Sequence, residues 1–562
     1  MSDTPTTSIV EKVKSASNFL RGSLQESLRD SATGAIAEDD THLSKFHGVY
    51  QQDDRDVRDE RRRQLLEPDY QFMIRARVPG GVCTPAQWLA MDDIAGRWAN
   101  GSIRITSRQA FQFHGVLKNR LKSSIGAIND SLLDTLAACG DVNRNVMSTA
   151  LPESSVLHRE VYEMAGALSA HLTPATSAYH EIWLDKKRLT KEPDSEPLYG
   201  ETYLPRKFKI AFAIPPRNDV DVFANDMGFI AISDGDRVAG YNVTVGGGMG
   251  ATHGDPATYP RLADVLGYCS PGQVLEVTAA IVSIQRDYGD RLERKHARFK
   301  YTIDDHGLEW LHDELEKRVG YRLEPAREFE FTHTGDLFGW QRTDDGLWHL
   351  GMFIENGRIQ DSDNASQRAG LRAIAEIHTG EFRLTGNQNL VIAAITEEQR
   401  PAIDALALKH GLDGFNTYSP LRLNSIACVA FPTCGLAMAE SERYLPDLIS
   451  KIEALLAAHQ LDKQEITIRM TGCPNGCARP YMAEIGLVGK GPGMYNLHLG
   501  AAFNGTRLNT LVAEAIQEDE ILSRLDTLFT RYGADRHESE HFGDFLQRAG
   551  IVTSITETGV TT

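Results

Sequence analysis

The sequence predicts an internally duplicated protein of mixed α and β structure (α+β and α/β), whose two halves are related by a pseudo-two-fold axis. Two sequence repeats lead to this prediction. Residues 101–109 (GSIRITSRQ) match residues 380–388 (GEFRLTGNQ), and residues 241–246 (YNVTVG) match residues 495–500 (YNLHLG). Because both matches occur in the same order along the chain, a duplication with insertions and deletions explains them better than chance does.

Each half is expected to contain a smaller unit of sheet and helices, followed by a larger α/β unit. Residues 72–78 (FMIRARV) have the composition of a strand, which the turn-forming residues 79–81 (PGG) end. Residues 85–99 look like an amphipathic helix, and the repeated segments alternate as strands do. A weaker match sets residues 143–146 (NRNV) beside residues 423–426 (LNSI). The elements of the second half should therefore repeat those of the first.

The bulk properties indicate a soluble cytoplasmic protein of several domains. The chain has 562 residues, of which 41% are hydrophobic and 24% charged, so it exceeds one ordinary core. It lacks a signal-peptide pattern, and no apolar run approaches the roughly 18–20 residues that span a bilayer. A net charge of −18 disfavours broad nucleic-acid binding. Residues 1–60 are polar, and nearly every residue from Asp53 to Arg63 is charged, which suggests a mobile or docking arm.

Four of the seven cysteines form two closely spaced pairs. Cys428 and Cys434 are separated by five residues, Cys473 and Cys477 by three, and 38 residues lie between the pairs. Four thiolates can hold an iron–sulfur cluster or a zinc ion. The spacing favours a cluster, because structural zinc sites usually show two-residue gaps. Zinc and unligated thiols remain alternatives, and the scattered Cys83, Cys139 and Cys269 are interpreted as small buried apolar residues.

Several basic clusters occur within this acidic chain. Residues two or four apart on a strand share a face, so a continuous strand would gather one cationic and polar face from residues 104–114. Its members would be Arg104, Arg108, Gln112 and His114. Arg75 and Arg77 would share a face in the same way, as would Lys207 and Lys209, and residues 291–300 are also basic. A solvated sheet face is the alternative, but several such clusters together suggest a polyanionic ligand beside a small anionic substrate.

The glycine run 246–248 could approach a cofactor closely, although a plain turn explains it about as well. Neither this run nor any other segment shows a convincing dinucleotide or flavin fingerprint. If the protein is a reductase, its electrons should therefore arrive from another chain.

The cysteine segments 428–434 (CVAFPTC) and 471–477 (TGCPNGC) resemble the cluster motifs of the sirohaem-containing sulfite and nitrite reductases. Further segments look like the haemoprotein (beta) subunits of NADPH-dependent assimilatory sulfite reductases. These segments are 18–22 (NFLRG), 46–55 (FHGVYQQDDR), 143–145 (NRN), 203–209 (YLPRKFK) and 495–500 (YNLHLG). The resemblance extends over nearly the whole chain.

The resemblance implies paired ferredoxin-like half-domains and two larger α/β domains that hold sirohaem and the cluster. The expected boundaries are 1–62 for a polar arm that docks a flavoprotein, 63–140 and 336–415 for the half-domains, 141–335 for the sirohaem and substrate domain, and 416–562 for the cluster domain.

The resemblance also implies roles for individual residues. Cys428, Cys434, Cys473 and Cys477 would bind one 4Fe–4S cluster, and Cys477 would also be the axial ligand of one sirohaem. The substrate-binding and catalytic positions would be Arg77, Arg144, Lys207 and Lys209. The cofactor-binding positions would be Arg104, Arg108, Gln112, His114, Arg206 and Asn475.

The activity expected from this resemblance is the six-electron reduction of sulfite to sulfide, for sulfate assimilation and cysteine biosynthesis. Electrons would come from a separate flavoprotein (alpha) subunit that carries FAD and FMN and oxidises NADPH. A ferredoxin-dependent sulfite or nitrite reductase is the nearest alternative. A zinc-stabilised binding module without redox chemistry and a simple iron–sulfur electron carrier are the others.

Overall fold

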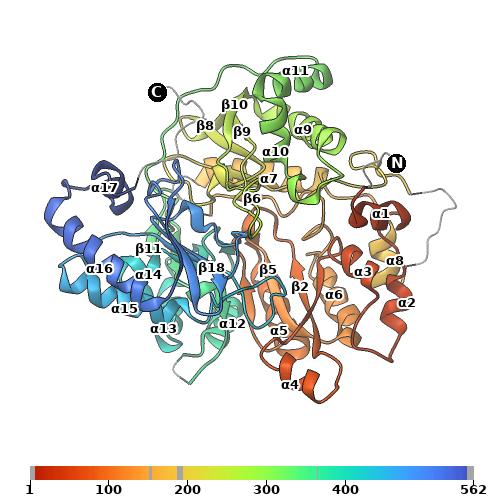
Figure 1. Ribbon diagram of the computed structural model, residues 1–562, viewed down its shortest axis with the longest axis horizontal. Coiled ribbons are helices and arrows are strands. Elements are labelled where there is room, and N and C mark those ends of the chain that lie inside the picture. The colour runs from red at the N-terminus through yellow and green to blue at the C-terminus, as the bar shows by residue number, and fades with distance from the viewer. Residues whose placement is uncertain (1–6, 151–154, 187–193, 364, 553–562) are drawn as a thin grey trace.

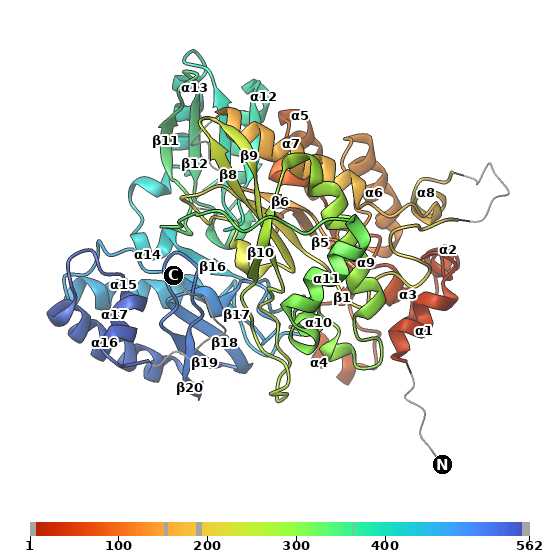
Figure 2. The same cartoon turned by 90° about the horizontal axis from the view of Figure 1, so that it is seen from above.

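The computed structural model describes residues 7–150, 155–186, 194–363 and 365–552 (Figures 1 and 2). Within these residues the strands form four five-stranded sheets, two in the smaller units and two in the larger ones. The fold class is therefore the duplicated mixture of α and β structure that the sequence predicts.

The two smaller sheets exchange one strand each. The first has the order β1-β2-β5-β4-β13 and the second the order β11-β12-β15-β14-β3. The strands of the first sheet are β1 (Val49–Asp53), β2 (Tyr70–Ala76), β5 (Phe111–Val116), β4 (Ile103–Ile105) and β13 (Arg358–Ile359). Those of the second are β11 (Gly339–Arg342), β12 (Trp348–Met352), β15 (Leu390–Ile395), β14 (Glu381–Leu384) and β3 (Val82–Cys83). The half-domains are thus interlocked.

Glycine makes both strand exchanges possible. Gly81 precedes β3 and Gly357 precedes β13, and both have positive φ, at 77° and 73°. A Cβ atom on Gly81 would lie 2.6 Å from the carbonyl oxygen of Leu384, and one on Gly357 would lie 2.3 Å from that of Ile105. Leu384 and Ile105 occupy equivalent positions in the repeat, so both crossings require a residue without a side chain.

The helices α5 (Pro85–Trp98) and α12 (Gln367–Ile377) pack together between the half-domains. Helix α5, expected at residues 85–99, begins at a capping box in which the side chains of Thr84 and Gln87 each accept from the other's backbone N–H. From α5, the ring of Trp88 stacks on Phe382 of the other half-domain, with 4.7 Å between the ring centroids. The interlocked sheets therefore share one core.

Each larger unit has a mixed sheet with helices. The first sheet has the order β10-β9-β8-β7-β6 and the second β16-β17-β18-β19-β20. The first unit contains β6 (Met147–Ser148), α7 (Ser155–His171), α8 (Ala178–Trp183), β7 (Ile210–Ala213), β8 (Met227–Asp234), β9 (Arg237–Val245), β10 (Asp264–Cys269), α9 (Val274–Tyr288), α10 (Phe299–His306) and α11 (Leu308–Val319). The second contains α14 (Pro420–Leu423), β16 (Ser425–Ala427), α15 (Leu445–Ala458), β17 (Ile468–Thr471), β18 (Ile485–Gly491), β19 (Met494–Leu499), β20 (Thr510–Ile516), α16 (Glu518–Asp535) and α17 (Phe542–Arg548).

The remaining helices are α1 (Ile9–Ala16), α2 (Leu24–Arg29), α3 (Glu38–Leu43), α4 (Arg58–Arg63), α6 (Leu121–Asp130) and α13 (Arg400–Lys409). Figure 1 shows α1–α3 on one side of the molecule and α15–α17 on the other.

Both strong sequence repeats fall on equivalent strands. The first pair lies on β4 and β14, and the second on β9 and β19. The weaker match is displaced by one residue. When Tyr241 is aligned with Tyr495, the residue pairs can be followed from β9 to β6 in one sheet and from β19 to β16 in the other. Met147 is then the counterpart of Ile426. The prediction had placed Val146 at that position. A two-residue strand such as β6 gives too short a pattern to fix its register from sequence.

The N-terminal segment is folded, which corrects the expectation of a mobile arm. Strand β1 pairs with β2 and forms the edge of the first half-domain sheet, so part of the segment before residue 62 packs with this half-domain. Leu20, Leu24 and Phe46 are buried. The fully buried ammonium group of Lys14 donates to the carbonyl oxygen of Leu204 at 2.7 Å. A few apolar residues spaced along a polar segment were sufficient to anchor it; residues 1–6 lie outside the described residues.

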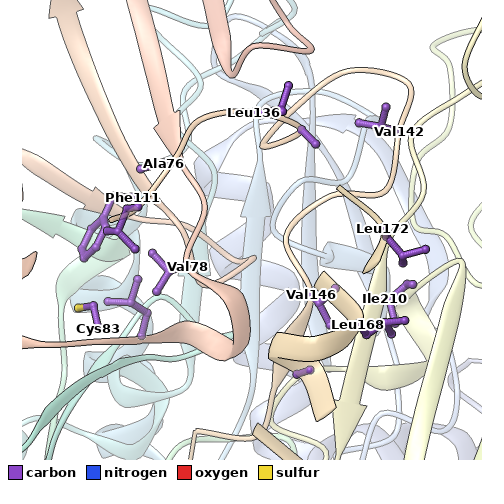
Figure 3. Packing of buried hydrophobic residues seen from close by; sticks show 14 of the residues in the cluster. Ala76, Val78, Cys83, Phe111, Leu136, Val142, Val146, Leu168, Leu172 and Ile210 are labelled. Carbon is purple, nitrogen blue, oxygen red and sulfur yellow. The ribbon is translucent and has the colours of Figure 1, made fainter. Parts of the chain in front are cut away.

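The apolar core is continuous across three of the four sheets. One cluster of buried side chains joins both half-domains to the first larger unit, whereas the second larger unit has its own cluster around α15 and α16. Figure 3 shows Ala76 and Phe111 of the first half-domain together with Val146, Leu168 and Ile210 of the larger unit. Among the described helices, none combines the length and apolar composition that a membrane crossing requires.

We expect Phe46→Ala to lower the free energy of unfolding by about 3–5 kcal/mol, the usual cost of truncating a buried phenylalanine. The Phe46 ring is 2% exposed and contacts Tyr203, with 5.3 Å between the centroids. Urea unfolding followed by circular dichroism measures the change. Leu65→Ala is the control, since Leu65 is 94% exposed and should change stability by less than about 0.5 kcal/mol. Equal stability of both variants would contradict the packing of the N-terminal segment.

Candidate active site

The cysteines meet at the carboxyl ends of two neighbouring strands. Cys428 follows β16 and Cys473 follows β17, and these strands are parallel and adjacent. The loops that continue from them supply Cys434 and Cys477. The backbone N–H of Gly472 donates to Cys428 Sγ at 3.3 Å, and the side-chain amide of Asn475 donates to Cys473 Sγ at 3.5 Å. The structure thus brings the four predicted cysteines together and surrounds their sulfur atoms with N–H donors.

Burial and mutual repulsion affect the ionisation of these thiols. Burial, followed by the neighbouring Cys477, raises the pKa of Cys428 to about 12 and that of Cys473 to about 11. The pKa of Cys434 is raised for the same reasons. Iron supplies the positive charge that such thiols need in order to ionise. Among the described side chains, no three His, Cys, Asp or Glu are placed to hold a single metal ion.

The first half lacks the cysteines. The strand register makes Thr149 the counterpart of Cys428, one residue beyond the predicted Met147 and Ser148. The hydroxyl of Thr149 donates to Asp219 at 2.9 Å, and Asp219 is the counterpart of Cys477. A hydroxyl and a carboxylate therefore occupy the positions that two cysteine thiols occupy in the second half. This agrees with the prediction that only one half kept the cofactor site.

Two lysines project beside the cysteines from the segment just before β7. Burial, and then the positive charges of Arg298 and Arg206, lower the pKa of Lys207 to about 7. Burial and Lys207 itself hold the pKa of Lys209 well below its usual value. The Cys477 thiol opposes this shift at Lys207, so Lys207 and Cys477 lie close enough to interact. The structure thus places both predicted lysines at the cysteine site.

The predicted Arg144 also belongs to this group of cations. Its Nε donates to the carbonyl oxygen of Gly140 at 2.8 Å, and its Nη1 donates to that of Ala138 at 3.4 Å. The Arg144 side chain is 8% exposed and lowers the pKa of both Lys207 and Arg108. Carbonyl partners leave the positive charge of Arg144 uncompensated.

Arg77, predicted to bind substrate, is held elsewhere. Its guanidinium donates twice to Asp134, at 2.8 and 2.7 Å, and also to Ser169 and Thr173. Arg75 lies at the site instead: its Nη1 donates to Cys139 Sγ at 3.0 Å, and its positive charge interacts with Cys477. Two-residue alternation could not separate these arginines, because β2 ends at Ala76 and Arg77 pairs with Asp134 instead of continuing the strand.

The cationic face expected across residues 104–114 is interrupted by a turn. Strands β4 and β5 form a hairpin in which Arg104 lies opposite Gln112, and Gln109 in the turn has a positive φ of 49°. Arg104 donates to Glu442 at 2.8 Å and to the carbonyl oxygen of Ala427 at 2.9 Å. The prediction of one continuous strand was therefore wrong, because a tight turn follows Ile105.

The same hairpin separates the other predicted residues of this face. His114 meets the guanidinium of Arg358 through Nδ1 at 3.3 Å. Burial and Arg358 hold the pKa of this histidine well below its usual value. Arg104, Gln112 and His114 thus lie on the side of Glu442 and the Cys428 strand, whereas Arg108, in the turn, reaches the lysines.

Arg108 is half-buried among other cations. It donates to Asn225 Oδ1 at 2.7 Å and to the carbonyl oxygens of Asn145 and Ile210 at 2.6 and 2.9 Å. Burial lowers its pKa to about 9. The Nε atoms of Arg108 and Arg75 are both buried without a hydrogen-bond partner in the described structure. Unpartnered donors in a cationic group fit an anionic ligand.

Two further predicted cofactor-binding residues also lie here. Burial lowers the pKa of Arg206 to about 10, although Asp141 opposes the shift. Asn475 lies in the cysteine loop, against the loop that the glycine run begins: the N–H of Ala251 donates to the carbonyl oxygen of Pro474 at 2.9 Å. Gly476 must be a glycine, because its φ is 62° and a Cβ atom would lie 2.6 Å from the carbonyl oxygen of Met249.

Tyr50 and Cys139 were missed as site residues. Burial and Cys139 raise the pKa of the Tyr50 phenol to about 12, and Arg144 and Arg75 act on the same phenol. Cys139 is buried, as expected, but it accepts a hydrogen bond from Arg75 and is not purely apolar. No sequence signal pointed to Tyr50, since it comes from the segment predicted as an arm.

The thiols and cations together fit the predicted cofactors. Four gathered thiols are the ligand set of an iron–sulfur cluster. A carboxylate-rich macrocycle would neutralise the cationic group and supply acceptors for its buried donors.

Two family models match this chain. The nitrite and sulphite reductase 4Fe-4S domain matches residues 163–323, and the nitrite/sulfite reductase ferredoxin-like half domain matches residues 63–130 and 341–410. The second match occurs twice, on the two interlocked units.

Relatives match over nearly the full length. The NADPH sulfite reductase hemoprotein beta-component of Myxococcus xanthus is 59% identical over 97% of both chains. That of Geobacillus kaustophilus is 57% identical over 98% of this chain and 96% of its own. The solved structure of the Mycobacterium tuberculosis NirA protein is 26% identical, with a TM-score of 0.78 over 96% of this chain and 95% of that one. The chain therefore belongs to the nitrite and sulfite reductase family.

Proposed function

We propose that this chain is the haemoprotein subunit of an assimilatory sulfite reductase, which reduces sulfite to sulfide with six electrons. The observation that carries the proposal is the position of Cys477. This thiol belongs to the four-cysteine group and also interacts electrostatically with Lys207 and Arg75 of the cationic group. A site that transfers electrons through sulfur ligands and a site that binds an anion therefore meet at one residue.

The four cysteines would hold a 4Fe–4S cluster, and Cys477 would also ligate the sirohaem iron. These cofactors would relay electrons from the donor and provide the metal at which the anion is reduced. Arg108, Arg206 and the backbone around Asn475 would hold the macrocycle. Arg104, Gln112 and His114 would contact the cofactors from the side of the β4–β5 hairpin that faces Glu442.

The remaining cations can bind the substrate and supply protons. The guanidinium groups of Arg75 and Arg144 present several N–H donors in a planar fork, so they suit the binding of sulfite oxygens and the polarisation of S–O bonds. Lys207 has a pKa of about 7, which suits proton donation near neutral pH. Each sulfite oxygen leaves as water, which takes two protons, so the site must be recharged with protons repeatedly.

The electron donor is proposed to be a flavoprotein subunit that carries FAD and FMN and oxidises NADPH, and the complex is proposed to work in the cytoplasm in cysteine biosynthesis. The relatives' names, which specify NADPH and a beta-component, support this donor.

The segment before Arg63 is proposed to contribute to docking of that flavoprotein. Arg55 donates to the carbonyl oxygens of Cys434 and Ala437, at 3.0 and 2.7 Å, and lies over the ring of Phe431. A partner bound at this segment would therefore lie beside the cluster ligands.

The two family models cover nitrite reductases as well as sulfite reductases, so a ferredoxin-dependent sulfite or nitrite reductase is the second candidate. Steady-state turnover of both anions, with NADPH plus the flavoprotein and separately with reduced ferredoxin, distinguishes the two. Faster sulfite turnover with NADPH and flavoprotein supports the proposal, whereas preference for ferredoxin or nitrite contradicts it.

Cys477→Ser is expected to abolish sulfite reduction, because an alcohol does not replace a thiolate that serves two metal centres. Iron and acid-labile sulfide content, with the visible absorption spectrum, should show loss of the cluster, of its coupling to the haem, or of both. Cys269→Ser is the control, since Cys269 lies in β10 away from the site. Retained turnover in Cys477→Ser would refute the axial assignment.

Arg75→Ala should impair sulfite turnover by roughly 100-fold while the cofactor spectrum persists, because a charge-stabilising donor is lost. Arg77→Ala should instead reduce stability by about 1–3 kcal/mol, since it removes the hydrogen bonds of a buried guanidinium but leaves a partly exposed Asp134 that water can solvate. Kinetics with a chemical electron donor and urea unfolding separate the two effects. The reverse pattern would restore Arg77 to the substrate site.

The exposed pair Arg62→Glu and Arg63→Glu should slow flavoprotein-coupled turnover by roughly 3- to 10-fold at low ionic strength, through weaker electrostatic association. Reduction by a small chemical donor should be unchanged. Lys409→Glu, on exposed α13, is the matched control. If the variant and the parent have equal rates in the flavoprotein-coupled assay, a docking role for α4 is excluded. We choose substitutions and not a deletion of about 50 residues, because such a deletion would destroy the packing of the N-terminal segment.

A further inference from the structure

Two residues at equivalent positions of the two halves contact each other in the interior. Asp221 precedes the short helix η3 (Val222–Ala224), and Arg479 precedes η8 (Pro480–Met482). Both adopt left-handed backbone conformations, with φ of 46° and 55°. The carboxylate of Asp221 accepts from Nε of Arg479. Equivalent residues can touch only where the pseudo-two-fold axis passes between them, so this ion pair lies on the axis.

The same arginine also joins the two half-domain hairpins. Its Nη1 donates to the carbonyl oxygen of Ser107 at 3.0 Å, and its Nη2 donates to that of Gly386 at 2.8 Å. Ser107 and Gly386 are equivalent residues of the first sequence repeat. The Arg479 guanidinium therefore binds the same point of both β-turns.

A further hydrogen bond connects this arrangement to the cysteine loop. The hydroxyl of Ser107 donates to the carbonyl oxygen of Cys477 at 2.9 Å, two residues before Arg479. Ser107 in turn directly precedes Arg108 of the cationic group. The peptide of Cys477, the turn that carries Arg108 and the Arg479 guanidinium thus form one closed ring of contacts.

The charges in this ring are deeply buried. Asp221 is fully buried, Arg469 is 2% exposed and Arg479 is 7% exposed. Arg469 donates to the same carboxylate oxygen at 2.5 Å, while the other oxygen has no hydrogen-bond partner in the described structure. Asp336 also lies near these cations. Burying such an ionic cluster costs free energy that an apolar cluster would not, so stability alone does not account for these residues.

We propose that Asp221 and Arg479 are positioning residues that fix the Cys477 thiol relative to the Arg108 turn. The inference rests on the proposed function, in which Cys477 serves both cofactors and Arg108 holds the macrocycle. Asp221 anchors Arg479 on the axis, and Arg479 then holds the first-half turn against the second-half cysteine loop. The Cys477 thiol of the second half and the Arg108 turn of the first half are thereby held in a fixed relative position.

Arg479→Lys tests this role, because an ammonium group keeps the charge but cannot donate to Asp221, Ser107 and Gly386 together. With a chemical electron donor, sulfite turnover should fall by about 100-fold, the loss typical of an ångström-scale misplacement. The haem absorption band and midpoint potential should shift, at unchanged iron content per chain. Asp221→Asn should shift the same signals in the same direction.

Ser107 provides a milder pair of variants that should fold. Ser107→Ala removes the hydrogen bond to Cys477, and it should shift the haem band and potential in the same direction as Arg479→Lys. Ser107→Thr keeps the hydroxyl and should restore the parent signals. If Arg479→Lys does not fold, the Ser107 pair decides the question.

Arg368→Lys is the matched control. The Arg368 guanidinium also donates to an aspartate, Asp92, and to the carbonyl oxygens of Gly101 and Asp92, but it lies between the half-domain helices. It should leave the haem band and potential unchanged. If Arg479→Lys or Ser107→Ala has the haem band and midpoint potential of the parent protein, the inference is overturned. An equal shift of both quantities in Arg368→Lys would also overturn it. A parent protein without sirohaem absorption would instead refute the proposed function.

Discussion

The constraint on which the rest of this structure depends is a group of cations, most of them half-buried, that the protein itself does not neutralise. Arg75, Arg108, Arg144 and both lysines converge beside the cysteines, and desolvation lowers the pKa of Lys207, Lys209 and Arg108. Like charges held this close together repel one another when no counter-ion is bound. The surrounding scaffold must therefore be rigid enough to hold the cations together until an anion binds.

That scaffold explains why the N-terminal segment is folded. Lys14 of α1 and Arg294 both pair with Asp141, close to Arg206. Asp141 lies three residues before Arg144, and Lys14 also binds the carbonyl oxygen of Leu204 in the segment that leads to Lys207. The helix thus supports both loops that supply cations, and Tyr50 of β1 reaches the same group.

The duplication shows how one fold can hold an active site in only one of two equivalent places. In the repeat, Arg108 corresponds to Asn387 and Lys209 to Thr467. Asn387, Thr467 and Arg469 line an internal cavity of about 10 Å³, which is close to the room that one water molecule needs. This counterpart position therefore leaves no room for a macrocycle.

Sequence by itself determined the duplication, the four cysteines and the two lysines, because these depend on residue types and local spacing that a chain displays directly, whereas Arg144 was predicted only through the family resemblance. Tertiary structure decided that Arg75 and not Arg77 reaches the site, that Arg104 and Arg108 separate at a turn, and that the N-terminal segment packs into the core. Each of these depends on where a strand ends, on a positive-φ turn or on a contact between distant segments. Strand alternation gives only two sides for a side chain, whereas its actual partners are set by how whole sheets cross in three dimensions.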